Sequence, residues 1–211
     1  MEPVRSEAEI AQIVLAEPTD YQRRRTFLGL LAEAAELPPR GFIVVGGSAA
    51  QLYTEGQIPS GDVDLLVSDR RKVASILRRW RFVDHGKLLS KDDWGIHIDL
   101  MGGTYEGSER LTREVATPYA RIRLSSIEDL ILGRIREVRV LPGQYRPRAH
   151  VEMAKRAYAQ AIVLIRQYQD DIDWAQINWH ARREALEDLV ADARERARDP
   201  RWEQPKDLRL E

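Results

Sequence analysis

The sequence is constrained most by two apolar segments that flank a glycine turn and a polar loop. Residues 42–48, FIVVGGS, run from an unbroken apolar stretch directly into Gly-Gly-Ser. Residues 62–67, DVDLLV, place two carboxylates at the start of a second apolar stretch. Side chains of a strand alternate between its faces, so we expect Asp62 and Asp64 to point the same way, about 7 Å apart along the backbone. The apolar residues that alternate with them would anchor this strand in the core: Val63, Leu65 and Val67.

The turn and the carboxylates suggest two kinds of ligand. Two carboxylates on one strand can share a divalent metal ion, whose geometry needs rigid support. Gly46 and Gly47 lack a Cβ atom, so their backbone can approach a ligand closely. Ser48 is expected to cap the helix that follows, and the unpaired N–H groups at a helix start attract phosphate. These residues therefore predict a metal site beside a phosphate site.

Taken together, these features resemble the nucleotidyltransferase superfamily, which has the polymerase-β-like fold. The resemblance rests on the Gly-Gly-Ser turn, a short helix from Ala49 to about Glu55, and Asp-x-Asp on the next strand; by motif it covers residues 42–134. The sequences of residues 52–56 and 60–64 are similar to those of a prokaryotic branch of uncharacterised nucleotidyltransferase-like proteins. The wider group includes proteins that are components of toxin–antitoxin systems. The resemblance implies an α/β (α+β) fold: a mixed sheet flanked by helices, with a C-terminal helical region.

The resemblance also implies a set of site residues. In that family the glycine–serine turn holds a nucleoside triphosphate, and the Asp-x-Asp pair, with a third acidic residue on a neighbouring strand, holds two magnesium ions. Residues 95–101, GIHIDLM, alternate as a strand and carry Asp99, which we expect to be the third carboxylate. The implied ligands of Mg²⁺ or Mn²⁺, which are also the catalytic residues, are Asp62, Asp64 and Asp99. The implied nucleotide-binding residues are Gly46, Gly47, Ser48, Ser60 and Arg134.

Ser60 and Arg134 enter this set for different reasons. Many relatives carry an arginine and a threonine just before their acidic pair; here Ser60 stands in for the threonine, and Ile58 occupies the place of the arginine. The segment 126–134, SIEDLILGR, resembles the part that links the catalytic sheet to the helices in this branch, where a basic residue often follows. Arg134 is that residue. In the same segment, Ser126 followed three residues later by Asp129 predicts a capped helix start.

The implied activity is metal-dependent transfer of a nucleoside monophosphate from a nucleoside triphosphate to an acceptor: a protein, an RNA or a small molecule. Asp62 and Asp64 would bind both metal ions, and Asp99 would bind the catalytic ion and act as base toward the acceptor. Two alternatives remain open. A non-catalytic partner-binding protein is favoured by Ile58, which replaces the arginine of many relatives, and by the helical C-terminal region, which could present an interaction face. The family branch favours a toxin that modifies transfer RNA ends, with a cognate toxin or antitoxin as partner.

The remaining elements follow from periodicity and turn residues. Helices are expected over 7–16, 21–37 and 70–80, a short strand over 82–89, a turn over 90–94 and a strand over 120–124. A Pro/Gly-rich loop, 141–148, separates a catalytic domain (1–140) from a helical region (141–211), in which we expect helices over 149–168, 174–180 and 181–198, the last two running together.

Several polar residues are more economically explained by structure than by ligand binding. Arg23–Arg25 are expected on a solvated helix face and Lys87 at a solvated strand end. Asp171 and Asp173 precede a helix and are expected to cap it. His97 shares a strand face with Asp99 and could line the same cleft, although a lone strand histidine is more often a surface or packing residue.

Composition sets the outer bounds. With 211 residues, 43% of them hydrophobic, the chain can bury a substantial core. Lys plus Arg number 33 against 34 Asp plus Glu, so no global basic field points to nucleic acid. There are no cysteines, which excludes disulfides and thiolate zinc sites. No apolar run approaches the roughly 20 residues that span a bilayer, and the N-terminus lacks an apolar signal core, so we expect a cytoplasmic protein without a membrane partner.

Overall fold

The computed structural model describes residues 5–107, 109–140 and 148–203. Its internal contacts divide the chain into two compact units, one made of Met1–Gly56 and Ser60–Ser125, the other of Gln57–Pro59 and Ser126–Glu211. The first unit is mixed α/β and the second is helical, so the expected α+β fold with a C-terminal helical region is confirmed. The division falls before the helix that starts at Ile127, which groups with the C-terminal helices.

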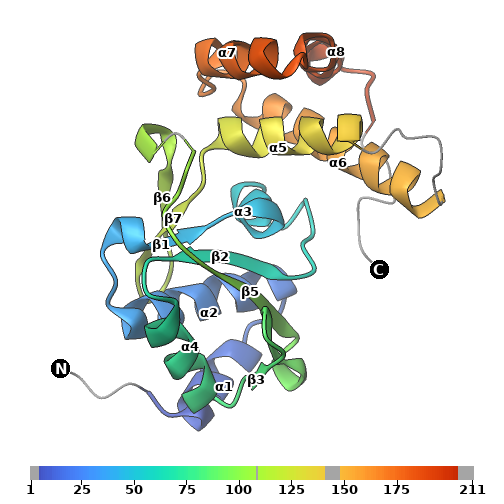
Figure 1. Cartoon of the computed structure of the whole chain (residues 1–211). Helices are drawn as coiled ribbons and strands as arrows, with labels where there is room; N and C mark the ends of the chain where they lie inside the picture. Colours follow the sequence, from blue (N-terminus) through green and yellow to red (C-terminus); the bar gives the residue numbers. More distant parts are fainter. Residues whose placement is uncertain (1–4, 108, 141–147, 204–211) are drawn as a thin grey trace. The chain divides into compact units, whose positions relative to one another are not determined.

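The first unit is built on a seven-stranded mixed sheet in the described part of the chain, ordered β3-β4-β5-β2-β1-β7-β6 (Figure 1). Its strands are β1 (Phe42–Val44), β2 (Val63–Val67), β3 (Val83–Asp84), β4 (Leu88–Lys91), β5 (Ile96–Gly102), β6 (Arg113–Ala116) and β7 (Arg121–Leu124). At its centre, β2 runs antiparallel to β1 and parallel to β5, and β1 runs parallel to β7.

Helices and short 3-10 turns connect these strands. The helices of this unit are α1 (Glu7–Leu15), α2 (Asp20–Ala35), α3 (Gly46–Tyr53) and α4 (Arg70–Arg79), and the 3-10 turns are η1 (Pro39–Gly41), η2 (Asp92–Trp94) and η3 (Glu109–Leu111). Between β2 and β5 the chain passes through α4 and the β3–β4 hairpin, which makes β2 and β5 a crossover-connected parallel pair. That pair carries the predicted carboxylates.

The core lies between the sheet and the helices α2 and α4, which pack against each other on one side of it (Figure 1). On β2 the residues that alternate with the carboxylates are fully buried, as predicted: Val63, Leu65 and Val67. An aromatic cluster extends this core, with Phe27 on α2 packed edge-on against Trp80, and Phe82 packed edge-on against Trp94. These rings add a large buried apolar area to the core of the first unit.

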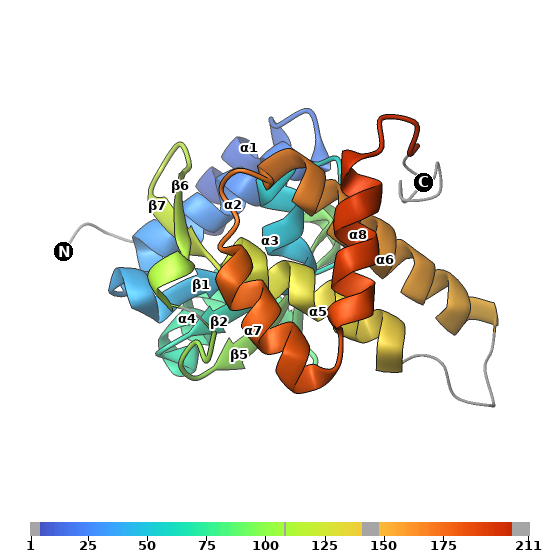
Figure 2. The ribbon, with the colours of Figure 1, turned by 90° about the horizontal axis from the view of Figure 1, so that it is seen from above.

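The second unit contains α5 (Ile127–Val140), α6 (Arg148–Tyr168), α7 (Trp174–Glu184) and α8 (Glu187–Arg198). Helix α6 packs against α5 and α8, and α7 packs against α5 and α8 (Figure 2). Asp173 caps α7 by accepting from the Gln176 backbone N–H at 3.1 Å, and Ser126 accepts from the Asp129 N–H at 3.1 Å, so both predicted helix starts are confirmed. The expected loop over 141–148 lies outside the described residues except for its last position.

Three predictions of element bounds are wrong, and one strand was missed. Helix α3 begins at Gly46 rather than Ala49. The single strand expected over 82–89 is the β3–β4 hairpin, because Gly86 at φ +91° turns the chain. Strand β6 was not expected. The continuous helix expected over 174–198 breaks at Ala185, whose left-handed φ of +53° ends α7.

In the described residues, no helix combines the length and the apolar character that a bilayer crossing requires.

Within the second unit, the ion pair between Arg136 on α5 and Glu184 on α7 predicts an acid-sensitive contribution to stability. Two guanidinium nitrogens of Arg136 donate to the Glu184 carboxylate, and these hydrogen bonds hold the pKa of Glu184 below its usual value of 4.5. Since the pKa is lower in the folded than in the unfolded chain, the contribution is present above pH 4.5 and is lost as the pH falls below it.

We therefore expect Glu184→Gln to reduce the free energy of unfolding at pH 7 by about 0.5–1 kcal/mol, an effect limited by the partial exposure of the pair. The difference from the wild type should shrink as the pH falls below 4.5, measured by urea denaturation across pH 3–7. Glu195→Gln, at an exposed position on α8, serves as the control. A pH-independent loss would show that the carboxylate charge does not matter.

Candidate active site

Two rows of polar side chains cross the paired strands β2 and β5. In the parallel register Asp64 lies directly opposite Asp99. Two residues earlier in each segment, Asp62 and His97 form a second row, with His97 Nδ1 3.9 Å from Asp62 Oδ1. Residues opposite each other on neighbouring strands share a face of the sheet. The structure thus brings the three predicted carboxylates together on one face of the first unit.

The glycine turn before α3 contacts one of these carboxylates directly. The backbone N–H of Gly47 donates to Asp64 Oδ2 at 3.0 Å, so a carboxylate takes the position at the helix start that favours an anion. Gly46 is required here for two reasons: its φ is +57°, and a Cβ at this position would lie 2.5 Å from Asp64 Oδ2. The sequence predicted this turn as a phosphate site; in the structure it orients Asp64.

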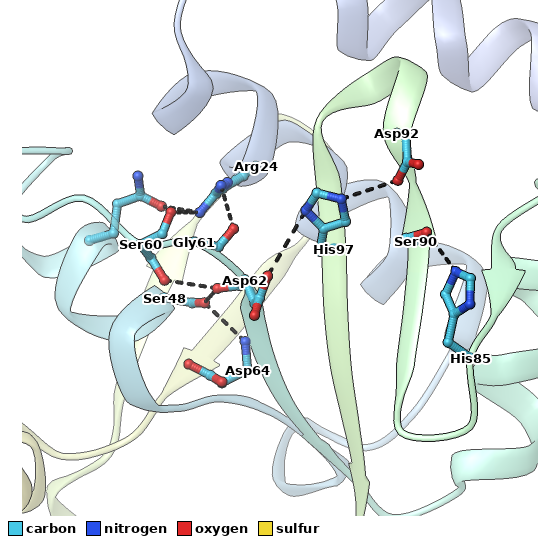
Figure 3. A network of polar contacts seen from close by, with 11 residues as sticks. Arg24, Ser48, Ser60, Gly61, Asp62, Asp64, His85, Ser90, Asp92 and His97 are labelled. Carbon is cyan, nitrogen blue, oxygen red and sulfur yellow. Dashed lines mark hydrogen bonds and ion pairs between the residues drawn. The ribbon is translucent and has the colours of Figure 1, made fainter. Parts of the chain in front are cut away.

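Ser48 does not cap the helix, because α3 already begins at Gly46 and its N-cap is Val45. The Ser48 side chain is buried at 2% exposure. Its hydroxyl donates to the Asp62 carbonyl oxygen at 2.6 Å and accepts from the Asp64 N–H at 3.0 Å (Figure 3). Ser60 also donates to the Asp62 carbonyl oxygen, at 2.8 Å. Both hydroxyls therefore fix the backbone that carries the two aspartates.

Arg24 is the residue that the sequence analysis missed. It was expected on a solvated helix face, yet it is buried at 8% exposure. Its Nη2 donates to the Gly61 carbonyl oxygen at 2.8 Å, and its Nη1 donates to the Ser60 carbonyl oxygen (Figure 3). Burial lowers the pKa of Arg24, while the negative charges of Asp20 and Asp62 act in the opposite direction.

A signal for this burial was present in the sequence. Arg24 shares a helical stripe with residues three, four and seven positions later, all of which are buried: Phe27, Leu28 and Leu31. The helical period therefore placed Arg24 on the core side of α2. This position was missed because three consecutive arginines are typical of a solvated helix face.

His97 was expected as a surface or packing residue. It is partly exposed and lies between two carboxylates, with Nδ1 toward Asp62 and Nε2 3.2 Å from Asp92 Oδ1 (Figure 3). Asp92 belongs to η2 and is 84% exposed. His97 thus borders the site through its neighbour Asp62.

The carboxylates share a sheet face but do not converge on one point. Figure 3 shows the Asp64 carboxylate turned toward the start of α3 and the Asp62 carboxylate turned toward His97. In the part of the chain that the structure describes, no group of three or more His, Asp or Glu side chains is arranged to hold a metal ion. Asp64 accepts from the Gly47 N–H and Asp62 faces His97, an arrangement that keeps these two negative charges apart.

The donor set nevertheless suits a hard divalent cation. Carboxylate oxygens are the ligands that Mg²⁺ and Mn²⁺ prefer. Asp64 and Asp99 already share a row of the sheet, and the Asp62 side chain is 54% exposed, so it has room to rotate toward them. The residues present therefore fit such an ion.

Three further residues from the sequence analysis lie elsewhere or have other roles. Arg134 belongs to the second unit, where its Nη1 donates to Glu137 Oε1 at 2.6 Å; its role toward a nucleotide stays a prediction. Ile58 is fully buried. Lys87 is exposed at the strand end, as expected.

Comparison with known proteins adds no relative. No protein-family model matches the chain, and no curated protein or solved structure matches it significantly. The nucleotidyltransferase assignment therefore stays a prediction, carried by the residues and the geometry described above.

The contact between the glycine turn and Asp64 predicts the effect of a single methyl group. Gly46→Ala is expected to lower the free energy of unfolding more than Gly95→Ala, by about 1–2 kcal/mol, because only the first adds a clash to the positive φ. Gly95 has a φ of +65°, and a methyl group there would meet nothing within 4 Å, which makes it a matched control. Equal losses in thermal or urea denaturation would contradict the close approach of Asp64.

Proposed function

We propose that the first unit is a metal-dependent nucleotidyltransferase, which moves a nucleoside monophosphate from a nucleoside triphosphate onto an acceptor. The observation that carries the proposal is the parallel register of β2 and β5, which sets Asp64 opposite Asp99 with Asp62 two residues before. The glycine turn at the start of α3, whose Gly47 N–H donates to the Asp64 carboxylate, supports it further. Strand, glycine turn, helix and acidic strands occur in the order that the family resemblance implies.

Asp62, Asp64 and Asp99 are the residues that would hold the divalent cation. When bound, the cation neutralises the charge of the phosphates and favours ionisation of the acceptor hydroxyl. To hold the cation, the Asp62 side chain, which now faces His97, and the Asp64 carboxylate, which now accepts from the Gly47 N–H, would have to turn toward it. The N–H of Gly47 would then be available to a phosphate oxygen at the helix start.

The proposed transfer exchanges two bonds at the α-phosphorus. The acceptor oxygen forms a bond to the α-phosphorus, the bond from that phosphorus to the bridging oxygen breaks, and pyrophosphate leaves. The proton of the acceptor hydroxyl passes to the Asp99 carboxylate, which acts as general base. Since Asp99 lies on β5 between β4 and β2, its position is set by hydrogen-bonded strands on both sides.

Nucleotide binding is the first test. We expect calorimetry to show binding of at least one ribonucleoside triphosphate that depends on Mg²⁺ or Mn²⁺, and at least about tenfold weaker binding in the Asp62→Asn/Asp64→Asn variant. Asp92→Asn, which removes a nearby exposed carboxylate, is the control and should bind like the wild type. If the folded wild-type protein binds no nucleotide with either metal, the alternative of a non-catalytic partner-binding protein is favoured.

Transfer is the second test. With labelled nucleoside triphosphate and a screen of protein, RNA and small-molecule acceptors, we expect Asp64→Asn to abolish labelling while its circular dichroism and unfolding midpoint stay close to those of the wild type. Transfer RNA and a toxin or antitoxin encoded nearby belong in the screen. Undiminished labelling by Asp64→Asn would show that another residue performs the chemistry.

A further inference from the structure

We propose that Arg24 is a positioning residue. It holds residues Ser60 and Gly61, the turn before Asp62, in the conformation that presents the Asp62 carboxylate to the site. The effect of Arg24 on metal binding rests on the proposed function, whereas its stabilisation of the turn before Asp62 does not. Arg24 donates to the backbone carbonyls of Ser60 and Gly61, and we propose that it acts on the site through them.

The contacts of Arg24 match the shape of a guanidinium group. Its two terminal nitrogens donate to two successive carbonyl oxygens, those of Ser60 and Gly61, and Nη1 also lies 3.4 Å from Gln51 Oε1 on α3. The planar fork of arginine is suited to such paired acceptors. Arg24 thus joins α2 to both α3 and the turn.

The hydrogen bonds that hold this segment engage its backbone and not the Asp62 carboxylate. Arg24 donates to the two carbonyls just before Asp62, the hydroxyls of Ser48 and Ser60 donate to the Asp62 carbonyl, and Ser48 accepts from the Asp64 N–H. The Asp62 side chain is 54% exposed and faces His97. The main chain is thus constrained while the carboxylate stays at the surface beside His97 (Figure 3).

Burial makes this contact costly to lose. The cost lies with Arg24, because its side chain is buried and a buried cation without acceptors is strongly unfavourable, whereas Ser60 is half-buried and Gly61 is exposed. Removing Arg24 takes away the donors that hold the Ser60 and Gly61 carbonyls, so we expect the chain before Asp62 to lose its fixed conformation. Groups that orient metal ligands from behind typically change metal affinity by about 10–100-fold.

The same helix offers a matched control. Arg25 also donates to a backbone carbonyl, with Nη2 2.8 Å from the Ala116 oxygen, but that carbonyl lies at the end of β6. Arg25→Gln removes a single, more exposed arginine-to-carbonyl contact on the same helix and leaves the turn before Asp62 untouched. A purely structural arginine would behave as Arg25 does.

The first measurement is amide hydrogen exchange, which needs no metal. We expect Arg24→Gln to speed exchange of the Asp64 amide, which donates to Ser48 Oγ, by at least about tenfold relative to the wild type. Arg25→Gln should leave that amide unchanged. If Arg24→Gln does not fold, Arg24→Lys, which keeps the charge and cannot bridge both carbonyls, is measured instead and should give a smaller acceleration in the same direction.

The second measurement is Mn²⁺ affinity by calorimetry in the presence of nucleoside triphosphate. We expect about a tenfold loss in Arg24→Gln and none in Arg25→Gln. Because Arg24 acts through Asp62, the loss should disappear in an Asp62→Asn background, which a double-mutant cycle detects.

The outcomes separate the two proposals. Unchanged exchange at Asp64 in a folded Arg24 variant, or equal effects of the Arg24 and Arg25 variants, overturns the positioning role. If Arg24→Gln lowers Mn²⁺ affinity by the same factor in the Asp62→Asn background as in the wild type, the positioning role is overturned as well. If the wild type binds no Mn²⁺ but the Arg24 variant exchanges faster at Asp64, the proposed function fails and the hold on the turn stands.

Discussion

The parallel pairing of β2 with β5 is the constraint on which the candidate site depends. It sets Asp64 opposite Asp99 and brings His97 to Asp62 across the sheet. A slip of one residue in either strand would turn its carboxylates into the core, where an unpaired charge is strongly unfavourable. The buried Val63, Leu65 and Val67 resist such a slip, because each would have to leave the core at the same time. Packing on one face therefore maintains the spacing of charges on the other.

Around these strands, residue types that bind phosphate elsewhere are used to shape the protein itself. Ser48 bridges the Asp62 carbonyl and the Asp64 N–H, and the Gly47 N–H donates to the Asp64 carboxylate. Arg24 donates to the Gly61 carbonyl in the turn before Asp62. Glycine, serine and arginine satisfy backbone groups and bind anions through the same hydrogen-bonding chemistry. A motif built of them predicts where a site lies better than it predicts which partner each donor has.

Most elements could be predicted from local patterns, and the errors have local causes. The stripe of α4, the alternation of β2 and β5, and the caps at Ser126 and Asp173 needed only a few neighbouring residues. The break between α7 and α8 was missed because Ala185 is a strong helix former and gives no warning of a left-handed φ. The β3–β4 hairpin was predicted as one strand, since Gly86 alone marks its turn.

The sequence by itself determined the period of each element, and hence that Asp64 and Asp99 lie on the faces opposite the apolar residues of their strands. Periodicity is a local property and survives in any fold that buries one face. Only the tertiary structure decided that Arg24 donates to the carbonyls of Ser60 and Gly61, and that the Asp64 carboxylate accepts from the Gly47 N–H. The carbonyls of a turn and the first N–H groups of a helix have no partner within their own element, so their partners come from whichever segments the fold brings beside them.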